Sequence, residues 1–410
     1  MSADDAAAAL VDPSAYADGR LERACDTLRN TSPVHRVDEE AFLPFYVLTK
    51  HHDVQEVERN PARFLAAPRY RLRRKPDDLR GEPARSLVSM DPPDHTEYRA
   101  LTADWFHPRK LDVFDESVRA LARAAVDRMA AHDEPYDFVT EVSMQLPLAV
   151  ICSMLGIPES DRDLVLRLTQ LAFGSEDAEY QQLAQVDGME SGMRFAQYFA
   201  GVAQDRLAHP TDDLSSVLAH SQLHGEPLPP GDLLGYFGIL ATAGHDTTSS
   251  TIAGGLQALV EHPDELERLR ADPSLVPSAV EEMIRWVSPV QNMARTATRD
   301  VTVRDQQVEE GDQLILFYPS ANRDEEVFED PQRFDIGRRP NPYIAFGFGT
   351  HFCLGASLAR LECRVMFGEL LRRLPDIRLG PDAALPRRAS NFVSGLETMP
   401  VEFTPAAREG

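Results

Sequence analysis

The stretch FGFGTHFCLG, residues 346–355, stands directly before an amphipathic helical pattern and contains Cys353, one of four cysteines in the chain. Glycines on both sides of Cys353 allow the backbone to approach a flat ligand without a clash of Cβ atoms. Backbone N–H groups at the start of the following helix favour a thiolate at this position. The pattern therefore predicts that Cys353 is an axial metal ligand. The alternative is a buried structural cysteine, which fits Cys152 and Cys363 better.

A long helix is predicted by apolar periodicity over residues 231–262, with the segment AGHDTT, residues 243–248, in its middle. Glycine, aspartate and threonine are poor choices for a helix interior, and a threonine hydroxyl can bond a carbonyl one turn back and bend the helix. We expect a local distortion that opens a groove beside a cofactor and places Asp246 and Thr247 where protons are needed. The alternative is a kinked core helix without chemistry.

Glu282 and Arg285 form an i,i+3 pair on one face of a helix predicted over residues 264–288. Such pairs are usually solvated surface bridges that contribute little to stability. The irregular segment PQRF, residues 331–334, offers a second guanidinium group at Arg333. We expect the three side chains to form a buried ionic lock with a structural role.

His95 and Arg99 are spaced by four residues in DPPDHTEYRALT, so both side chains lie on one face of a predicted helix. Together they could donate hydrogen bonds to a pair of carboxylates on a ligand. The alternative is an ordinary solvated helix face.

The composition bounds the class of protein. The chain has 410 residues, 43% of them hydrophobic, and a net charge of −24, which favours solubility and argues against a nucleic-acid partner. Its four unpaired cysteines fit a reducing cytoplasm, and we recognise no signal peptide and no membrane-spanning run. The patterns predict a mainly α protein with small β-sheets (α+β) in one domain over residues 1–410, with residues 1–20 as a flexible leader.

Taken together, these segments resemble the bacterial soluble cytochromes P450 from about Val47 to Phe403. The resemblance implies the cytochrome P450 fold, with haem b held between the long central helix and the Cys-bearing loop and helix, and Cys353 as the iron ligand. It further implies that Asp246 and Thr247 are an acid–alcohol pair that delivers protons to dioxygen, and that Glu282, Arg285 and Arg333 are the structural triad. The other cofactor-binding positions that it implies are His95, Arg99, Arg295, His351, Phe346, Gly349, Gly355, Ala243 and Gly244.

Some stretches are similar to particular groups within that family. ATAGHDTTSS, SANRDEEVF and MDPPDHTEYR resemble members that hydroxylate terpenes such as α-terpineol, and SNFVSGLETMPVEFTP resembles members that oxidise steroid side chains. The resemblance implies a haem-thiolate monooxygenase that uses O2 to hydroxylate a small-to-medium apolar substrate of terpene, alkyl-aromatic or steroid-like character. By analogy, substrate contacts are expected from Leu240, Val290, Met293, Phe392 and Val393.

Electrons should come from a separate protein, because the sequence lacks dinucleotide and flavin motifs of its own. We expect a ferredoxin as the donor, served by a ferredoxin reductase. Arg109, Lys110, Arg360 and Arg364 could form a basic landing patch for it, or could be scattered surface charges. The alternative functions are a haem-binding gas sensor or carrier without turnover, and a peroxide-driven enzyme; the acid–alcohol pair argues against both.

Overall fold

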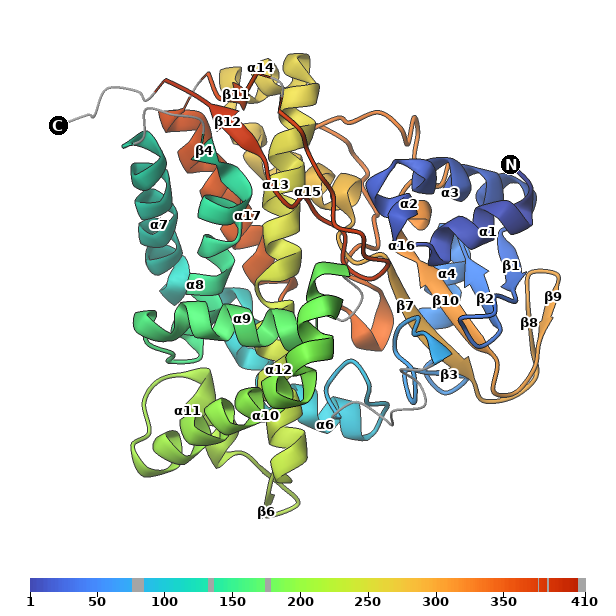
Figure 1. The fold of residues 1–410 in the computed structure, drawn as a ribbon, viewed down its shortest axis with the longest axis horizontal. Coiled ribbons are helices and arrows are strands. Elements are labelled where there is room, and N and C mark those ends of the chain that lie inside the picture. Colours follow the sequence, from blue (N-terminus) through green and yellow to red (C-terminus); the bar gives the residue numbers. More distant parts are fainter. Residues whose placement is uncertain (76–84, 132–135, 174–177, 375, 382, 405–410) are drawn as a thin grey trace.

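Helices dominate the computed structural model, which describes residues 1–75, 85–131, 136–173, 178–374, 376–381 and 383–404. Figure 1 shows most of the helices gathered on one side of the molecule, with the N-terminal helices and the largest sheet on the other. The described α-helices are α1 (Ala3–Val11), α2 (Ser14–Ala17), α3 (Arg20–Thr31), α4 (His51–Glu58), α6 (Asp94–Ala100), α7 (Pro108–Ala130), α8 (Gln145–Met154), α9 (Arg162–Phe173), α10 (Ala178–Ala208), α11 (Leu214–His220), α12 (Pro230–Ala243), α13 (Asp246–Glu261), α14 (Pro263–Ala271), α15 (Val276–Val287), α16 (Tyr318–Ala321) and α17 (Ala356–Arg373). The predicted fold class, mainly α with small sheets, is confirmed.

The largest sheet has the strand order β1-β2-β10-β7-β3. Strand β10 runs parallel to β2, and the other neighbours are antiparallel, with Leu314 of β10 opposite Arg295 of β7. Every residue of β2 and β10 is buried, as expected for strands covered on both faces. The strands of this sheet are β1 (Val34–Val37), β2 (Phe45–Leu48), β3 (Phe64–Leu65), β7 (Asn292–Ala297) and β10 (Gln313–Phe317).

Smaller strand pairs and short turns complete the described structure. The strands are β4 (Tyr136–Asp137), β5 (Gln222–Leu223), β6 (Glu226–Pro227), β8 (Val301–Val303), β9 (Gln306–Val308), β11 (Arg378–Leu379) and β12 (Pro400–Glu402). The short 3₁₀ and π turns are η1 (Ala103–Phe106), η2 (Val139–Ser143), η3 (Glu159–Asp161), η4 (Pro273–Leu275) and η5 (Gly349–His351).

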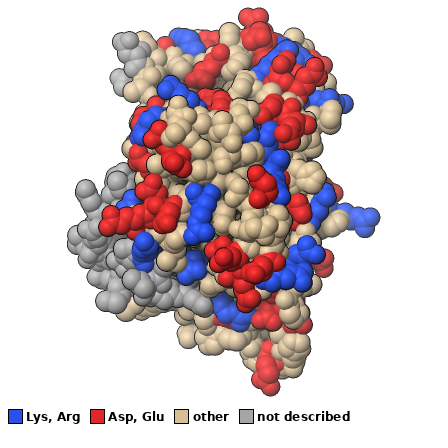
Figure 2. Space-filling model, turned by 90° about the vertical axis from the view of Figure 1, so that its right-hand side faces the viewer, with Lys and Arg blue, Asp and Glu red and all other residues tan. Residues whose placement is uncertain are grey.

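The surface mixes charges of both signs. On the described part of the face in Figure 2, acidic and basic side chains are interspersed rather than gathered in one broad basic stripe. Such a stripe is the electrostatic footprint of a nucleic-acid-binding protein. None of the described helices combines the length and the apolar character that a bilayer span needs.

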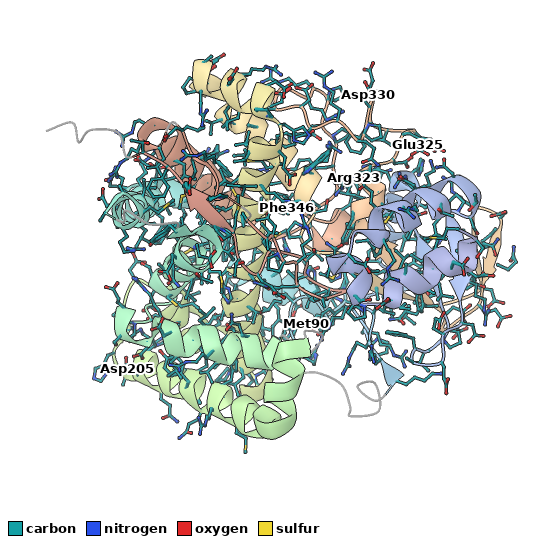
Figure 3. All side chains as sticks on the ribbon, turned by 45° about the horizontal axis from the view of Figure 1, so that its top comes forward. Met90, Asp205, Arg323, Glu325, Asp330 and Phe346 are labelled. Atoms are coloured by element: carbon teal, nitrogen blue, oxygen red, sulfur yellow. The ribbon has the colours of Figure 1, made fainter. Side chains whose placement is uncertain are left out.

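The N-terminal residues differ from the predicted flexible leader. Helix α1 begins with a capping box between Ser2 and Asp5, and α1 packs on α3. Leu10 and Tyr16 are buried in a core cluster that includes Phe45 of the sheet. Figure 3 shows Arg323 and Glu325 beside these helices, and the Nε of Arg29 in α3 donates to Glu325 at 3.2 Å.

The helix predicted over residues 231–262 is divided. Helix α12 ends at Ala243 and α13 begins at Asp246, with His245 between them in a distorted conformation at φ −116° and ψ −45°. The predicted distortion at the AGHDTT segment is therefore present, and it is strong enough to end one helix and start another. Helix α13 packs against α8, α15 and α17, and it crosses the centre of the view in Figure 1.

The ionic lock forms with a different third member. Glu282 and Arg285 are fully buried, and their bidentate pair has N–O distances of 2.8 and 2.7 Å. Arg338, not Arg333, supplies the second guanidinium group, because its Nε donates to Glu282 at 3.2 Å. Arg333 takes part through its backbone carbonyl, which accepts from both arginines. The choice between the two arginines depends on how the irregular segment crosses the helix.

Candidate active site

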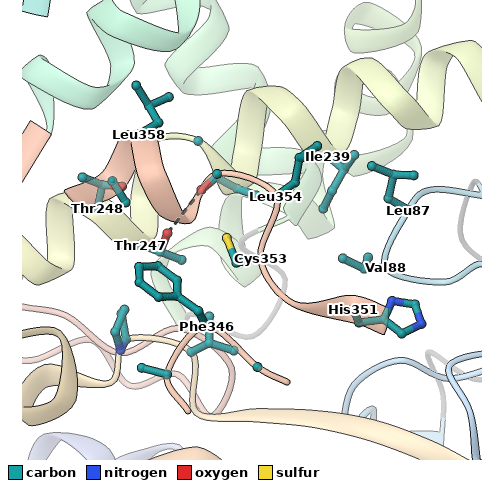
Figure 4. Close-up of a pocket in the computed structure, with 18 of the residues that line it drawn as sticks. Leu87, Val88, Ile239, Thr247, Thr248, Phe346, His351, Cys353, Leu354 and Leu358 are labelled. Carbon is teal, nitrogen blue, oxygen red and sulfur yellow. Dashed lines mark hydrogen bonds between the residues drawn. The ribbon is translucent and has the colours of Figure 1, made fainter. Parts of the chain in front are cut away.

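A large pocket lies where α12 and α13 face the loop before α17. The space within it, with the open mouth and adjoining solvent included, is about 1460 Å³. Residues from α6, β7, η5 and α17 complete its wall. Figure 4 shows the sulfur of Cys353 in the middle of this wall, with Phe346 and Thr247 around it.

Cys353 is held by a tight loop. Its backbone N–H donates to the carbonyl oxygen of Phe346 at 2.8 Å, which closes the loop on itself. Gly347 and Gly349 both have positive φ, at +69° and +67°, a conformation that favours glycine. A Cβ atom on Gly349 would lie 2.6 Å from the carbonyl oxygen of Glu58, so this glycine is also required by a close approach of two backbones.

The electrostatics of Cys353 suit a metal ligand better than a free nucleophile. Burial raises the pKa of its thiol, although the backbone N–H groups of Gly355 and Ala356 and the nearby Arg99 and Arg360 act in the opposite direction. A reactive cysteine would have a lowered pKa. A metal cation deprotonates a thiol directly, so a bound cation would hold the thiolate here. Among the described residues, no group of three or more His, Cys, Asp or Glu side chains forms a metal site.

Four basic side chains meet in the wall of the pocket, as the sequence predicted. The rings of His95 and His351 lie with their centroids 4.3 Å apart, and Arg99 donates from Nη2 to the carbonyl oxygen of Phe352 at 2.7 Å. Arg295 is buried and donates to the carbonyl oxygen of Ala294 at 2.8 Å. The four residues come from α6, β7 and η5, which are far apart in the sequence.

Arg295 has one acidic neighbour, Glu58, whose Oε1 lies 3.5 Å from its Nη2. The Nδ1 atom of His95 and the Nε2 atom of His351 are buried without a hydrogen-bond partner in the described structure. Burial and the neighbouring cations, Arg295 first, lower the pKa of His351 to about 2. Unpaired buried polar atoms are costly, and a ligand that carries carboxylates would pair them. The residues therefore fit a haem, whose propionates are such groups.

The acid and the alcohol of the predicted relay lie in different surroundings. Thr247 belongs to the pocket wall, and its Oγ1 donates to the carbonyl oxygen of Ala243 at 3.2 Å (Figure 4). Asp246 is not part of that wall; its Oδ1 accepts from Nη1 of Arg388 at 2.6 Å. Burial acts to raise the pKa of Asp246, but the ion pair with Arg388 outweighs it and lowers the pKa. The carboxylate is therefore held charged, away from the pocket.

The remaining predicted cofactor-binding residues lie partly inside and partly outside the pocket wall. Phe346, Gly355, Ala243 and Gly244 contribute to the pocket wall. Gly349 does not, although the structure requires it for the loop. No protein atom lies within 4 Å of a Cβ built on Gly355, so that glycine keeps space open beside Cys353.

Three of the five expected substrate contacts lie in the pocket wall: Leu240, Val290 and Met293. Phe392 and Val393 are not among the residues of the described wall, and a substrate contact of either stays a prediction. Phe392 lies under the guanidinium group of Arg71 at 4.8 Å, and Val393 forms a β-bridge with Val290. Leu87, Val88, Ile239 and Leu358 are apolar wall residues that the sequence did not single out.

Two buried acids of the wall also escaped prediction. Glu58 ends α4, and Glu362 lies on α17; each has one carboxyl oxygen without a hydrogen-bond partner in the described structure. Each stands at an apolar position of its helix, with Glu58 four residues after the buried Val54. The signal in the sequence that could have revealed them is an acidic residue at a helix position where the periodicity expects an apolar one.

The expected basic landing patch is only partly free. Arg360 forms a bidentate pair with Glu281 at 2.9 and 3.1 Å and lies over the ring of Phe346. Lys110 lies over the ring of Trp105. Arg109 is exposed near the start of α7, a helix that packs against α17. Arg360 therefore supports the Cys353 loop rather than a surface patch.

Comparisons with known proteins extend over nearly the whole chain. Residues 194–375 match the family model described as Cytochrome P450. The chain is 39% identical to cytochrome P450-terp from a Pseudomonas species, with 96% of each covered, and 39% identical to steroid C26-monooxygenase from Mycolicibacterium smegmatis, with 97% of this chain and 96% of that protein covered. The crystal structure of CYP108D1 from Novosphingobium aromaticivorans matches with a TM-score of 0.91 at 37% identity and covers 98% of this chain and 99% of that one.

Proposed function

This chain belongs to the cytochrome P450 family, and we propose on that premise that it hydroxylates a small-to-medium apolar molecule of terpene, alkyl-aromatic or steroid-like character. Membership of the family makes it a haem b monooxygenase that uses O2. The apolar part of the pocket wall supports the substrate class, because Leu87, Ile239 and Leu240 offer no polar group for recognition.

Cys353 binds the haem iron in this proposal, and His95, Arg99, Arg295 and His351 hold the propionates. When bound, the haem supplies the activation of dioxygen, and thiolate ligation favours O–O cleavage. The observation that carries the proposal is the combination in one pocket of the half-buried Cys353 and two imidazole nitrogens that have no hydrogen-bond partner among the described residues. Cys353 serves the metal, and the nitrogens serve the carboxylates.

Thr247 is the proton-handling group of the pocket. Its hydroxyl group lies in the wall and can pass a proton to dioxygen, because the bond to the Ala243 carbonyl is long and easily exchanged. Once its bond to Arg388 opens, the Asp246 carboxylate would take up a proton from solvent and return it to Thr247 through water. The apolar wall and a bound substrate keep other water out of the pocket.

The electron donor in this proposal is a ferredoxin served by a ferredoxin reductase, in the cytoplasm. The exposed Arg109 near the α7–α17 contact supports a docking face on the Cys353 side of the molecule. The surface is acidic overall, so docking of a ferredoxin requires a local basic region. Arg109 is the first residue to test for such a region.

Substrate identity is tested by optical titration of the haem spin state with monoterpenes, alkylbenzenes and steroids. We expect a low-to-high spin shift with at least one of these classes and a hydroxylated product in turnover with that compound. A shift only with charged or strongly polar compounds would contradict the proposal.

The proton role is tested with Thr247→Ala. We expect the ratio of product formed to electrons consumed to fall by about a hundredfold, the low end for loss of a positioned proton donor. Thr242→Ala is the matched control: its hydroxyl makes the same bond one turn back, to Gly238 at 2.7 Å, but lies outside the pocket wall. Equal coupling in the two variants would show that Thr247 handles no proton.

A further inference from the structure

Glu58 is a buried acid whose position in the fold is unusual. It is the last residue of α4, and its side chain is only 1% exposed. Val54 and Val57 of the same helix are buried beside it in an apolar cluster. Glu58 nevertheless belongs to the wall of the pocket, on the side of Arg295. A carboxyl group in this position costs free energy of desolvation unless it has partners.

One oxygen of Glu58 has partners and the other has none. Oε1 accepts from the hydroxyl of Tyr318 at 2.8 Å and lies 3.5 Å from Nη2 of Arg295. Oε2 is buried without a hydrogen-bond partner in the described structure. A side chain that only held Tyr318 and Arg295 in place would not need to leave its second oxygen unpaired at a pocket wall.

Glu58 also touches the loop that carries Cys353. A Cβ on Gly347 would lie 3.3 Å from Oε1 of Glu58, 3.6 Å from the Tyr318 hydroxyl and 3.7 Å from the His351 carbonyl oxygen. Three segments that are distant in sequence therefore converge at Gly347: the end of α4, α16 and the Cys353 loop itself. The convergence lies in the part of the pocket that holds the unpaired imidazole nitrogen of His351.

The charged and titratable groups that face Glu58 are Arg295 from β7 and Tyr318 from α16. On α4 itself, Asp53 pairs with Arg304 instead. Burial raises the pKa of Glu58 to about 7, while Arg295, Tyr318 and the backbone N–H of Phe348 act to lower it. The carboxyl group can therefore be a hydrogen-bond donor near neutral pH, and Oε2 is the oxygen free to carry the proton.

We propose that Glu58 is a further cofactor-binding residue of this chain, in which Oε2 shares a proton with a haem propionate beside Arg295. The inference rests on the proposed function, specifically on the role of Arg295 as a propionate partner. In the shared arrangement one proton serves two carboxyl groups, and the second carboxylate is neutralised by the guanidinium group. Loss of that proton adds a negative charge beside the haem, which favours the ferric state and lowers the midpoint potential.

The test is the midpoint potential of the haem-containing protein, measured by spectroelectrochemistry across the neutral pH range, in wild type and in Glu58→Gln. The glutamine keeps a donor for the propionate and an acceptor for Tyr318 but has no proton to lose. We expect the potential of wild type to fall as pH rises through the titration of Glu58, and the fall to be much smaller in Glu58→Gln. Asp53→Asn is the matched control, a buried acid on the same helix outside the pocket wall, and should behave as wild type.

A second variant shifts the transition instead of removing it. Tyr318→Phe deletes the hydroxyl that stabilises the charged carboxylate, so the pH at which the potential falls should move upward. A third measurement is the rate of haem transfer to an acceptor protein, which Glu58→Ala should increase by about tenfold or more, the equivalent of one hydrogen bond to a charged group.

The inference is overturned if Glu58→Gln keeps the pH dependence of wild type, or if Glu58→Ala releases haem no faster than Asp53→Asn. The carbon monoxide spectrum of each variant distinguishes failure of the role of Glu58 from failure of the proposed function. A thiolate-type spectrum with an unchanged pH dependence would remove the role of Glu58 and leave the proposed function intact. Loss of that spectrum in wild type would remove the proposed function itself.

Discussion

At the scale of single residues, the loop around Cys353 is defined by backbone geometry as much as by the sulfur. Gly349 combines a φ of +67° with a contact that leaves no room for a Cβ atom, because the carbonyl oxygen of Glu58 would lie 2.6 Å away. The loop is thereby fixed against the end of α4. The same approach brings Glu58 to the pocket wall, so one glycine sets the position of both the sulfur and the buried acid.

Gly349→Ala should destabilise the protein more than the same substitution at another glycine that has a positive φ but open space around it. Gly311→Ala is the control, since Gly311 has a φ of +91° and no atom within 4 Å of a built Cβ. In both variants, forcing alanine into the left-handed conformation should lower the free energy of unfolding by roughly 1–2 kcal/mol. Gly349→Ala should lower it further, because two backbones must move apart to admit the Cβ atom. Unfolding by denaturant measures both, and equal losses would contradict the close approach.

At the scale of elements, two features position the site: the break between α12 and α13, and the lock on α15. The break places Thr247 in the pocket and turns Asp246 toward Arg388. The lock ties α15 to the irregular segment that leads to the Cys353 loop, through Glu282, Arg285 and Arg338. Each feature determines which side chains reach the pocket.

Arg338→Ala should lower the free energy of unfolding by about 2 kcal/mol or more, because a buried guanidinium bond to a carboxylate is lost. The side chain also donates to the carbonyl oxygens of Glu329 and Arg333, so further bonds are lost with it. Arg333→Ala keeps its backbone carbonyl and removes only an exposed side chain, so it should change stability by no more than about 0.5 kcal/mol. A larger effect at Arg333 than at Arg338 would restore the triad predicted from sequence.

At the scale of the whole molecule, a charge network joins the N-terminal helices to the segment after α16. The Nζ atom of Lys50, only 4% exposed, lies 2.8 Å from Asp324 and 2.8 Å from Glu325. Arg29 of α3 reaches the other oxygen of Glu325. The N-terminal region is therefore tied to the body of the protein by ion pairs as well as by its apolar cluster.

This network should make stability depend on acid pH. Burial acts to raise the pKa of Glu325, but the hydrogen bonds from Lys50 and Arg29 outweigh it and lower the pKa to about 2, from an ordinary value of 4.5. The stabilisation is complete above the ordinary value and is lost as the pH falls toward about 2. Glu325→Gln should therefore unfold at a lower denaturant concentration than wild type at neutral pH, and the difference should shrink below about pH 4.5.

The control for that series is Glu326→Gln, whose carboxylate also lies near Lys50, at 3.0 Å, but is more exposed. It should cost less at neutral pH. A difference in stability between Glu325→Gln and wild type that grows on acidification would contradict the predicted pH dependence.

A structural feature could be predicted from the sequence where its signal lies in residues that are neighbours along the chain. The Cys353 loop and the break near Thr247 could be predicted because both rest on glycine, aspartate and threonine at positions that disfavour regular structure. The choice of Arg338 over Arg333 could not, because two arginines in one irregular segment differ only in which side chain turns inward. Helix α1 was missed although its capping pair, Ser2 and Asp5, was visible in the sequence.

The central claim, that Cys353 is the axial thiolate, is tested most directly by the spectrum of the carbon monoxide complex in wild type and Cys353→His. We predict that the reduced wild-type protein shows the long-wavelength band typical of a thiolate-ligated haem, and that Cys353→His retains haem but loses this band. Retention of the band in Cys353→His would contradict the account.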